Sequence, residues 1–274
     1  MFALSMVFVD TFVASYKKAP KEIVLDFDST DDAVHGKQEG RFFHGYYDLY
    51  CFLPLYVFCE NHLLCAYLRP SNIDDARHAL AILGLLVKHI RQSWPKTKII
   101  FRGDSSFCRW KLMRWCDRRD VGYIIGISKN SRLLDQTSFM LEEVKNQFLQ
   151  TGKKQTRFHE TSYAAKTWDK SRRIIVKAEH MAKGSNPRFV VTNLKGKPKA
   201  LYSRYCARGD MENRIKEQLL LYSDRTSCSK WLPNPLRILL SGLAYTLLQA
   251  IRQIALQGTE LANARYNTTR LKPG

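Results

Sequence analysis

The order of apolar segments along the chain limits the folds that it can adopt. Strand-like patterns occupy residues 23–28, the two segments within 46–68 that are broken at 60–62, and residues 97–101 and 122–127. Helical spacing occupies about residues 106–118 and residues 74–91, where Asp74 and Asp75 fall in the predicted first turn. This order of strand, hairpin, helix, strand, helix and strand predicts an α/β fold with a mixed sheet flanked by helices.

The pattern changes between about residues 150 and 200. Helical periodicity stops there, and alternating segments at 157–167, 172–180 and 188–193 are separated by turn-rich, basic sequence. Helices are predicted again at 202–222 and 235–257. The predicted parts are a terminal helix and linker (1–20), the first part of a core (21–149), a basic β-rich insertion (150–200), C-terminal core helices (201–258) and a flexible tail (259–274).

Charge and cysteine usage narrow the class of protein. The chain has 44 basic against 25 acidic residues, a net charge of +19, which favours a polyanionic partner such as nucleic acid or an anionic membrane surface. A basic, ribosome-associated protein is the alternative. The seven cysteines form no C-x-x-C pair, so neither a disulfide framework nor a zinc ribbon is predicted, and a reducing cytoplasm fits. Residues 236–256 are too polar for a membrane span, and residues 1–15 lack the features of a signal peptide.

Two aspartates stand at the ends of predicted strands. Asp28 ends the first strand, where a carboxylate at a sheet rim can face a ligand, although a turn aspartate bound to its own backbone is the alternative. Asp26 shares its face and is the rival ligand, but the strand end is more open to a bulky substrate. Asp104 closes the strand before the second core helix, and taken alone it is better explained as a helix N-cap.

A third acidic residue lies on a late predicted helix. Arg208 and Glu212 follow Tyr205 by three and seven residues, which places all three side chains on one helical face. Such a stripe can contact a phosphate and hold a cation, whereas a solvated face with ion pairs is the commoner explanation. Three carboxylates from distant segments are the ligand set that two divalent cations about 3.5–4 Å apart require.

These residues lie in sequence motifs that resemble the insertion-sequence DDE transposases, in particular the transposase DDE group 1 domain family. The similarity runs from about Phe12 to Gln249. Its landmarks include Val-Leu-Asp-Phe-Asp-Ser-Thr-Asp-Asp at 24–32, His-Gly at 35–36, Gln-Glu-Gly at 38–40 and Phe-His-Gly-Tyr-Tyr at 43–47. Further landmarks are Leu-Arg-Pro-Ser-Asn at 68–72, Arg-Gly-Asp-Ser-Ser-Phe at 102–107, Glu-Asn-Arg-Ile-Lys-Glu at 212–217 and Asp-Arg-Thr-Ser-Cys at 224–228.

The resemblance implies an RNase H-like, mixed five-stranded sheet with a β-rich insertion before the last catalytic helix. It implies that Asp28, rather than Asp26, joins Asp104 and Glu212 in holding two Mg²⁺ ions, which Mn²⁺ can replace. The implied activity is cut-and-paste transposition of a bacterial insertion sequence, by cleavage and transfer of DNA strands. The implied partners are double-stranded DNA, both transposon ends and target, and a second copy of the chain when the ends are paired.

The family's tyrosine–arginine–glutamate–lysine signature matches Tyr205, Arg208 and Glu212, but its lysine falls on Leu219. Lys216, one turn after Glu212, is the candidate to supply the missing charge to DNA. Trp168 is the candidate to stack on a flipped base, and core packing is its alternative. The basic insertion is expected to follow the DNA backbone, so that binding weakens steeply with salt.

The chain begins inside the last helix of the family's N-terminal region, which helps to recognise the transposon ends. An N-terminally truncated transposase located at the bacterial nucleoid is therefore expected. The alternatives are a non-catalytic DNA-binding remnant that modulates a full-length transposase and a free-standing RNase H-like nuclease.

Overall fold

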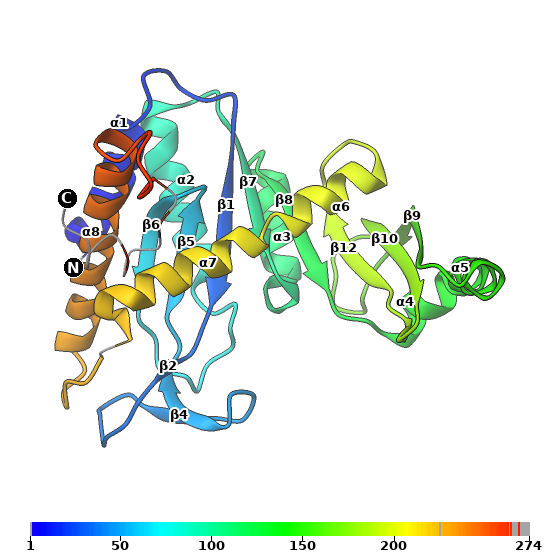
Figure 1. Cartoon of the computed structure of the whole chain (residues 1–274), viewed down its shortest axis with the longest axis horizontal. Coiled ribbons are helices and arrows are strands. Elements are labelled where there is room, and N and C mark those ends of the chain that lie inside the picture. Colours follow the sequence, from blue (N-terminus) through cyan, green and yellow to red (C-terminus); the bar gives the residue numbers. More distant parts are fainter. Residues whose placement is uncertain (1, 225, 263, 265–267, 269–274) are drawn as a thin grey trace. The chain divides into compact units, whose positions relative to one another are not determined.

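The structure, a computed structural model shown in Figure 1, describes residues 2–224, 226–262, 264 and 268. The chain divides into two compact units. Unit 1 combines residues 1–97 with 209–274, and unit 2 comprises residues 98–208. Much of the predicted tail and Arg225 of the 224–228 motif lie outside the described residues. Within the described part of the chain, no helix is both long and apolar enough to cross a membrane.

Unit 1 contains an antiparallel sheet and a second, smaller one. The first sheet has the order β1 (Glu22–Ser29), β5 (Leu55–Cys59), β6 (His62–Tyr67), and the small sheet has the order β2 (Asp32–Ala33), β4 (Leu49–Phe52), β3 (Phe42–His44). The predicted hairpin is confirmed for β5 and β6, which turn at Glu60 with a positive φ of 52°. Its first segment was predicted as one long strand. Instead, Leu53 and Pro54 separate β4 from β5, and β4 pairs with β2 and β3 in the small sheet.

The α-helices α1 (Phe2–Ala14), α2 (Ala79–Ser93), α7 (Gly209–Gln218) and α8 (Pro233–Ile254) belong to unit 1. Phe8 of α1, Met211 and Ile215 of α7, and Ile238 of α8 share one buried apolar cluster with Phe58 of β5. In Figure 1, α7 crosses the ribbons of β5 and β1. The helices α1, α7 and α8 thus bury apolar side chains against this sheet.

The start predicted for α2 is wrong. The helix begins at Ala79 and follows His78, whose backbone is left-handed, so Asp74 and Asp75 lie in the preceding loop instead of the first turn. Their loop has another role, because its backbone carbonyls accept hydrogen bonds from the side chain of Arg69.

Unit 2 is built on a mixed sheet, which confirms the α/β class. Its strands are β7 (Lys98–Gly103), β8 (Gly122–Ile127), β12 (Arg188–Thr192), β10 (Arg172–Met181), β9 (Gln155–Tyr163) and β11 (Gly184–Ser185). β7 and β8 are parallel and are connected through α3 (Trp110–Arg118), whereas β12 is antiparallel to β8 and pairs with β10. β9 and β11 both pair with β10. The strands predicted for the insertion therefore belong to the same sheet as β7 and β8.

The observed helices differ from the predicted ones in two further places. No helix is predicted for residues 128–149, where the structure has α4 (Ser131–Gln136) and most of α5 (Ser138–Thr151). The single helix predicted at 202–222 is interrupted. α6 (Pro198–Cys206) ends before Ala207 and Arg208, α7 begins at Gly209, and Leu219–Ser223 is distorted with a positive φ at Tyr222. Glycine has low helix propensity, which favours the interruption.

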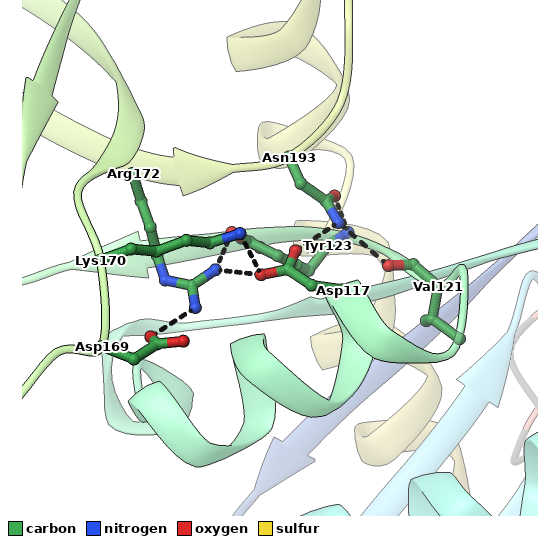
Figure 2. A network of polar contacts seen from close by, with 7 residues as sticks. All are labelled: Asp117, Val121, Tyr123, Asp169, Lys170, Arg172 and Asn193. Atoms are coloured by element: carbon green, nitrogen blue, oxygen red, sulfur yellow. Dashed lines mark hydrogen bonds and ion pairs between the residues drawn. The ribbon is translucent and has the colours of Figure 1, made fainter.

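A polar network joins the predicted insertion to α3 and β8 (Figure 2). The side chain of Arg172 on β10 is only 1% exposed, and it donates to Asp117 Oδ2 of α3 at 2.7 Å, to the Tyr123 hydroxyl of β8 at 2.7 Å and to Asp169 Oδ1 at 2.8 Å. Asn193 donates to Asp117 Oδ1 and to the Val121 carbonyl and accepts from the Tyr123 amide. The Arg172 and Lys170 cations hold the pKa of Asp117 below its usual range. One buried guanidinium therefore links three elements of unit 2.

Arg172→Met should destabilise the chain by about 3 kcal/mol, because it leaves the Asp117 carboxylate without its buried partner. The free energy of unfolding from urea denaturation measures this effect. Lys170→Met is the matched control, since Lys170 Nζ contacts the same Asp117 oxygen at 3.0 Å but is 55% exposed. It should cost less than about 1 kcal/mol. Equal losses in both variants would contradict the role assigned to Arg172.

Candidate active site

Asp28 lies at the carboxyl end of β1, opposite Tyr56 of β5. Residues directly opposite each other in an antiparallel pair point to the same face of the sheet. Because Tyr56 packs in one cluster with Met211 and Ile215 of α7, Asp28 is on the face that α7 covers. Asp28 is half-buried, and its Oδ1 accepts a hydrogen bond from the Ser29 amide at 3.1 Å. The rival Asp26 is only 6% exposed and lies deeper in the sheet, opposite Phe58.

Arg69 holds the end of β1 in place. Its fully buried guanidinium donates to the Ser29 hydroxyl at 2.7 Å and to the backbone carbonyls of Leu53 at 2.8 Å, Asp75 at 2.9 Å and Arg77 at 2.7 Å. Burial lowers the pKa of Arg69 to about 10, so the side chain stays charged at neutral pH. Arg69 lies in the Leu-Arg-Pro-Ser-Asn motif at 68–72, but the motif alone predicts no role for its side chain.

Glu212 is in the first turn of α7 and is exposed. The buried residues Met211, Ile215 and Gln218 form the face of α7 that packs inward. Because α7 covers the face of β1 and β5 that carries Asp28, Asp28 and Glu212 belong to the same side of the unit 1 sheet.

Asp104 directly follows β7 in unit 2 and caps a short 3₁₀ helix at Ser105–Phe107. Its Oδ1 accepts from the Ser106 amide at 2.9 Å and from the Ser106 hydroxyl at 2.6 Å. The capping alternative considered for this residue is therefore present in the structure. It occupies one carboxylate oxygen, so capping and cation binding by the other oxygen are compatible.

Tyr205 of α6 and the backbone of Asp104 both lie close to Gly126. A Cβ atom added at Gly126 would be 2.5 Å from the Tyr205 hydroxyl and 3.3 Å from the carbonyl carbon of Asp104. Burial and the negative charge of Asp104 raise the pKa of Tyr205, while the hydrogen-bonded, positively charged Arg208 acts in the opposite direction. Unit 2 thus brings Asp104, Tyr205 and Arg208 together, and glycine at position 126 leaves room for the phenol.

The other predicted DNA contacts have different environments. Lys216 is exposed on α7, whereas Leu219 packs against the apolar core of unit 1. The interruption at Ala207 and Arg208 means that Tyr205 and Glu212 are not on one continuous helix, so the predicted single helical stripe is wrong. Trp168 is half-buried in the loop between β9 and β10, and its ring packs edge-on against Tyr163 with centroids 5.5 Å apart.

Asp28 and Glu212 belong to unit 1, and Asp104 belongs to unit 2. Over the described residues, no three His, Cys, Asp or Glu side chains are gathered as ligands of one metal ion. The chemistry of the three predicted ligands still fits Mg²⁺, since carboxylate oxygens are its preferred protein donors.

Comparison with known families identifies the domain. The family model for the transposase DDE domain group 1 matches residues 1–272. The chain belongs to this family. The match confirms the resemblance found in the sequence and covers both units of the DDE domain.

No curated protein matches the DDE domain. Among solved structures, a chain described as "Cryo-EM structure of piggyBac transposase synaptic complex with hairpin DNA (SNHP)" has a TM-score of 0.53 and 9% sequence identity. The alignment covers 93% of the present chain and 52% of that chain. The DDE domain thus shares a fold with a chain of which it spans about half the length.

A buried carboxyl group connects two of the family motifs, residues 24–32 and residues 224–228. Asp32 of β2 is 2% exposed, and its Oδ2 accepts a hydrogen bond from the Thr226 hydroxyl. Nearby, Gln38 donates to the Thr226 carbonyl at 3.1 Å, and the ring of Trp231 lies against Gly40, whose φ is +82°. Contacts with residues 226–231 therefore stabilise the segment that follows Asp28. Burial raises the pKa of Asp32 to about 7.

This burial predicts a pH dependence. The unfolded chain releases the Asp32 proton near pH 4, whereas the folded chain keeps it up to about pH 7. Because the folded state binds more protons in this window, the free energy of unfolding should fall as pH rises from about 4 to 7, by up to about 1.4 kcal/mol per pH unit. Asp32→Asn should remove this contribution, which urea denaturation at several pH values measures. If the free energy of unfolding depends on pH equally in the wild type and in Asp32→Asn, this prediction is contradicted.

Proposed function

We propose that the chain is the catalytic domain of a bacterial insertion-sequence transposase that cleaves and joins DNA strands in cut-and-paste transposition. The family match over residues 1–272 carries this proposal. The RNase H-like description of its core, with the predicted insertion as an elaboration, is part of the proposal. Double-stranded DNA, both transposon ends and target, is the proposed substrate, and a homodimer on paired ends is the proposed assembly.

Asp28, Asp104 and Glu212 are the proposed ligands of two Mg²⁺ ions. Divalent ions held in this way activate the attacking oxygen and stabilise the leaving oxygen in phosphoryl transfer. The chain positions its own ligands in two ways. Ser106 orients Asp104 through Oδ1, which leaves Oδ2 for a cation. Arg69 fixes Ser29, and with it the strand end that carries Asp28.

Tyr205 and Arg208 are the proposed phosphate contacts. Their hydrogen bond and the proximity of Tyr205 to Asp104 support a role beside the scissile phosphate, because a guanidinium and a phenol can both donate to phosphate oxygens. Lys216 on α7 is the proposed further contact to the DNA backbone. Trp168 is the proposed ring for a flipped base, although its packing on Tyr163 already provides a structural role.

A non-catalytic DNA-binding protein that modulates a full-length transposase is the second candidate. The observation in its favour is Leu219, which packs on the core where the family signature has lysine. The two functions differ in one measurable property, which is Mg²⁺-dependent strand cleavage.

Asp28→Asn, Asp104→Asn and Glu212→Gln should each reduce Mg²⁺-dependent nicking at least about 100-fold, since each removes a ligand that contributes several kcal/mol to the transition state. The substrate is a supercoiled plasmid that carries the DNA flanking the coding sequence. Binding of the same DNA, measured by gel shift without metal, should change little.

Asp210→Asn is the matched control for Glu212→Gln, because Asp210 is an exposed carboxylate in the same first turn of α7. It should nick DNA at the wild-type rate. Nicking by Asp104→Asn at the wild-type rate would contradict the proposed site. A wild-type chain that binds the DNA but nicks no faster than Asp28→Asn would establish the non-catalytic function instead.

A further inference from the structure

The small sheet of unit 1 exposes aromatic rings that the proposed catalytic chemistry does not use. Phe43 on β3 is 53% exposed, Tyr50 on β4 is 49% exposed, and Tyr46 in the turn between these strands is 85% exposed. Figure 1 shows this small sheet beyond the carboxyl end of β1. Burying such rings would stabilise the fold by about 25 cal/mol per Å², so their exposure needs another explanation.

Phe43 and Tyr50 form a defined surface. They are directly opposite in the register of β3 and β4, which puts both rings on one face, and their ring centroids are 5.6 Å apart in an edge-to-face arrangement. The guanidinium carbon of Arg41 lies 4.6 Å from the centre of the Tyr50 ring. We call Arg41, Phe43 and Tyr50 the aromatic platform.

The remainder of the small sheet is held firmly, so the platform has a rigid base. Phe52, two residues after Tyr50 on the same face of β4, is fully buried in the apolar core of unit 1 and packs against Trp231. Ser71 donates to the Phe42 carbonyl of β3 at 2.9 Å. A surface with fixed rings loses little conformational freedom when a flat ligand stacks on it.

The chemistry of the platform matches an unpaired nucleobase next to a phosphate. Exposed aromatic rings stack on bases of any sequence, and an arginine held over a ring adds a cation that can pair with the backbone. Bases in a duplex already stack on each other, so the platform fits unpaired bases better than double-stranded DNA. The net charge of +19 favours a polyanion over another basic protein or a second copy of this chain.

The platform is also close to the end of β1. The Tyr46 ring, at the tip of the β3–β4 hairpin, contacts the Tyr47 ring with centroids 5.0 Å apart. Only Thr30 and Asp31 separate the end of β1 from β2, and Asp32 of β2 pairs with Phe52 of β4. The small sheet that carries the platform therefore begins just after the strand end that carries Asp28.

We propose that the aromatic platform binds unpaired bases of the DNA strand next to the cleavage position. This inference rests on the proposed function, because it assumes that DNA is the substrate. It adds a stacking surface in unit 1 that is separate from Trp168 and from Tyr205 and Arg208 of unit 2.

The test uses the full chain in metal-free buffer and a single-stranded oligothymidine that contains one 2-aminopurine, whose fluorescence is quenched by stacking. The wild type should quench the probe on binding. Phe43→Leu/Tyr50→Leu keeps apolar volume but removes both rings, and it should weaken binding at least about 5-fold for each ring, because one stacked base contributes about 1–3 kcal/mol. Phe43→Tyr/Tyr50→Phe keeps the rings and should bind as the wild type does.

Phe139→Leu is the matched control, because Phe139 is an exposed aromatic residue, 65% exposed, on α5 of unit 2. It should leave binding of the probe unchanged. Circular dichroism of the Leu/Leu variant verifies folding. If that variant does not fold, Arg41→Gln together with Tyr50→Phe provides the second test, with weaker binding expected from loss of the cation.

Three results would overturn the proposal. These are wild-type affinity in the Leu/Leu variant, absence of quenching by the wild type, and a loss of self-association in that variant with unchanged binding of the single strand. Because the assay needs no metal and no cleavage, its failure leaves the nicking test of the proposed function unaffected. Conversely, a chain that stacks on the probe but does not nick DNA would support base binding by the aromatic platform and exclude catalysis.

Discussion

The buried guanidinium of Arg69 is the interaction on which the functional part of unit 1 depends. Removing a cation from water is costly, and here four acceptors offset that cost: the Ser29 hydroxyl and the carbonyls of Leu53, Asp75 and Arg77. These acceptors belong to the end of β1, the junction of β4 with β5, and the loop before α2. One side chain therefore fixes both the strand that carries Asp28 and the root of the sheet that carries the aromatic platform.

Unit 2 also contains a buried arginine, which connects elements of its sheet and helices. Arg172 compensates Asp117 and Asp169 inside the sheet and joins β10 to α3 and β8. The strand ends at Asp104 and Gly126 are left for Tyr205 and Arg208 to approach. In both units a buried arginine provides rigidity, while the proposed ligands lie on more accessible strand and helix ends. Precise placement of carboxylates requires such support, because three like charges repel each other until cations compensate them.

Local patterns predicted much of this fold. The bounds of β8 follow from its apolar run, and β5, β6, β9, β10 and β12 follow from alternation and turns, because strand periodicity is a local property. The positions of Asp28 and Asp104 at strand ends also follow from these patterns. The link of Asp28, Asp104 and Glu212 to one reaction came from resemblance to a family and not from periodicity.

The remainder depends on contacts between distant residues. An isolated arginine in a motif does not indicate that it will be buried with acceptors from three segments, and Arg69 was therefore missed as a positioning residue. The interruption of the helix at Ala207 and Arg208 was missed because apolar spacing continues across it. The aromatic platform depends on the register of β3 and β4, which places Phe43 opposite Tyr50. The spacing of residues along the chain does not predict which residues of β3 and β4 are paired.

The proposed function requires Asp28 and Glu212 of unit 1 and Asp104 of unit 2 to hold one pair of divalent cations. The most direct measurement is a titration of the full chain, bound to DNA, with Mn²⁺ followed by electron paramagnetic resonance. The account predicts two bound ions per chain with magnetic coupling between them, as expected for ions about 4 Å apart. It predicts loss of that coupling in Asp104→Asn. Unchanged coupling in Asp104→Asn, or two isolated ions in the wild type, would contradict it.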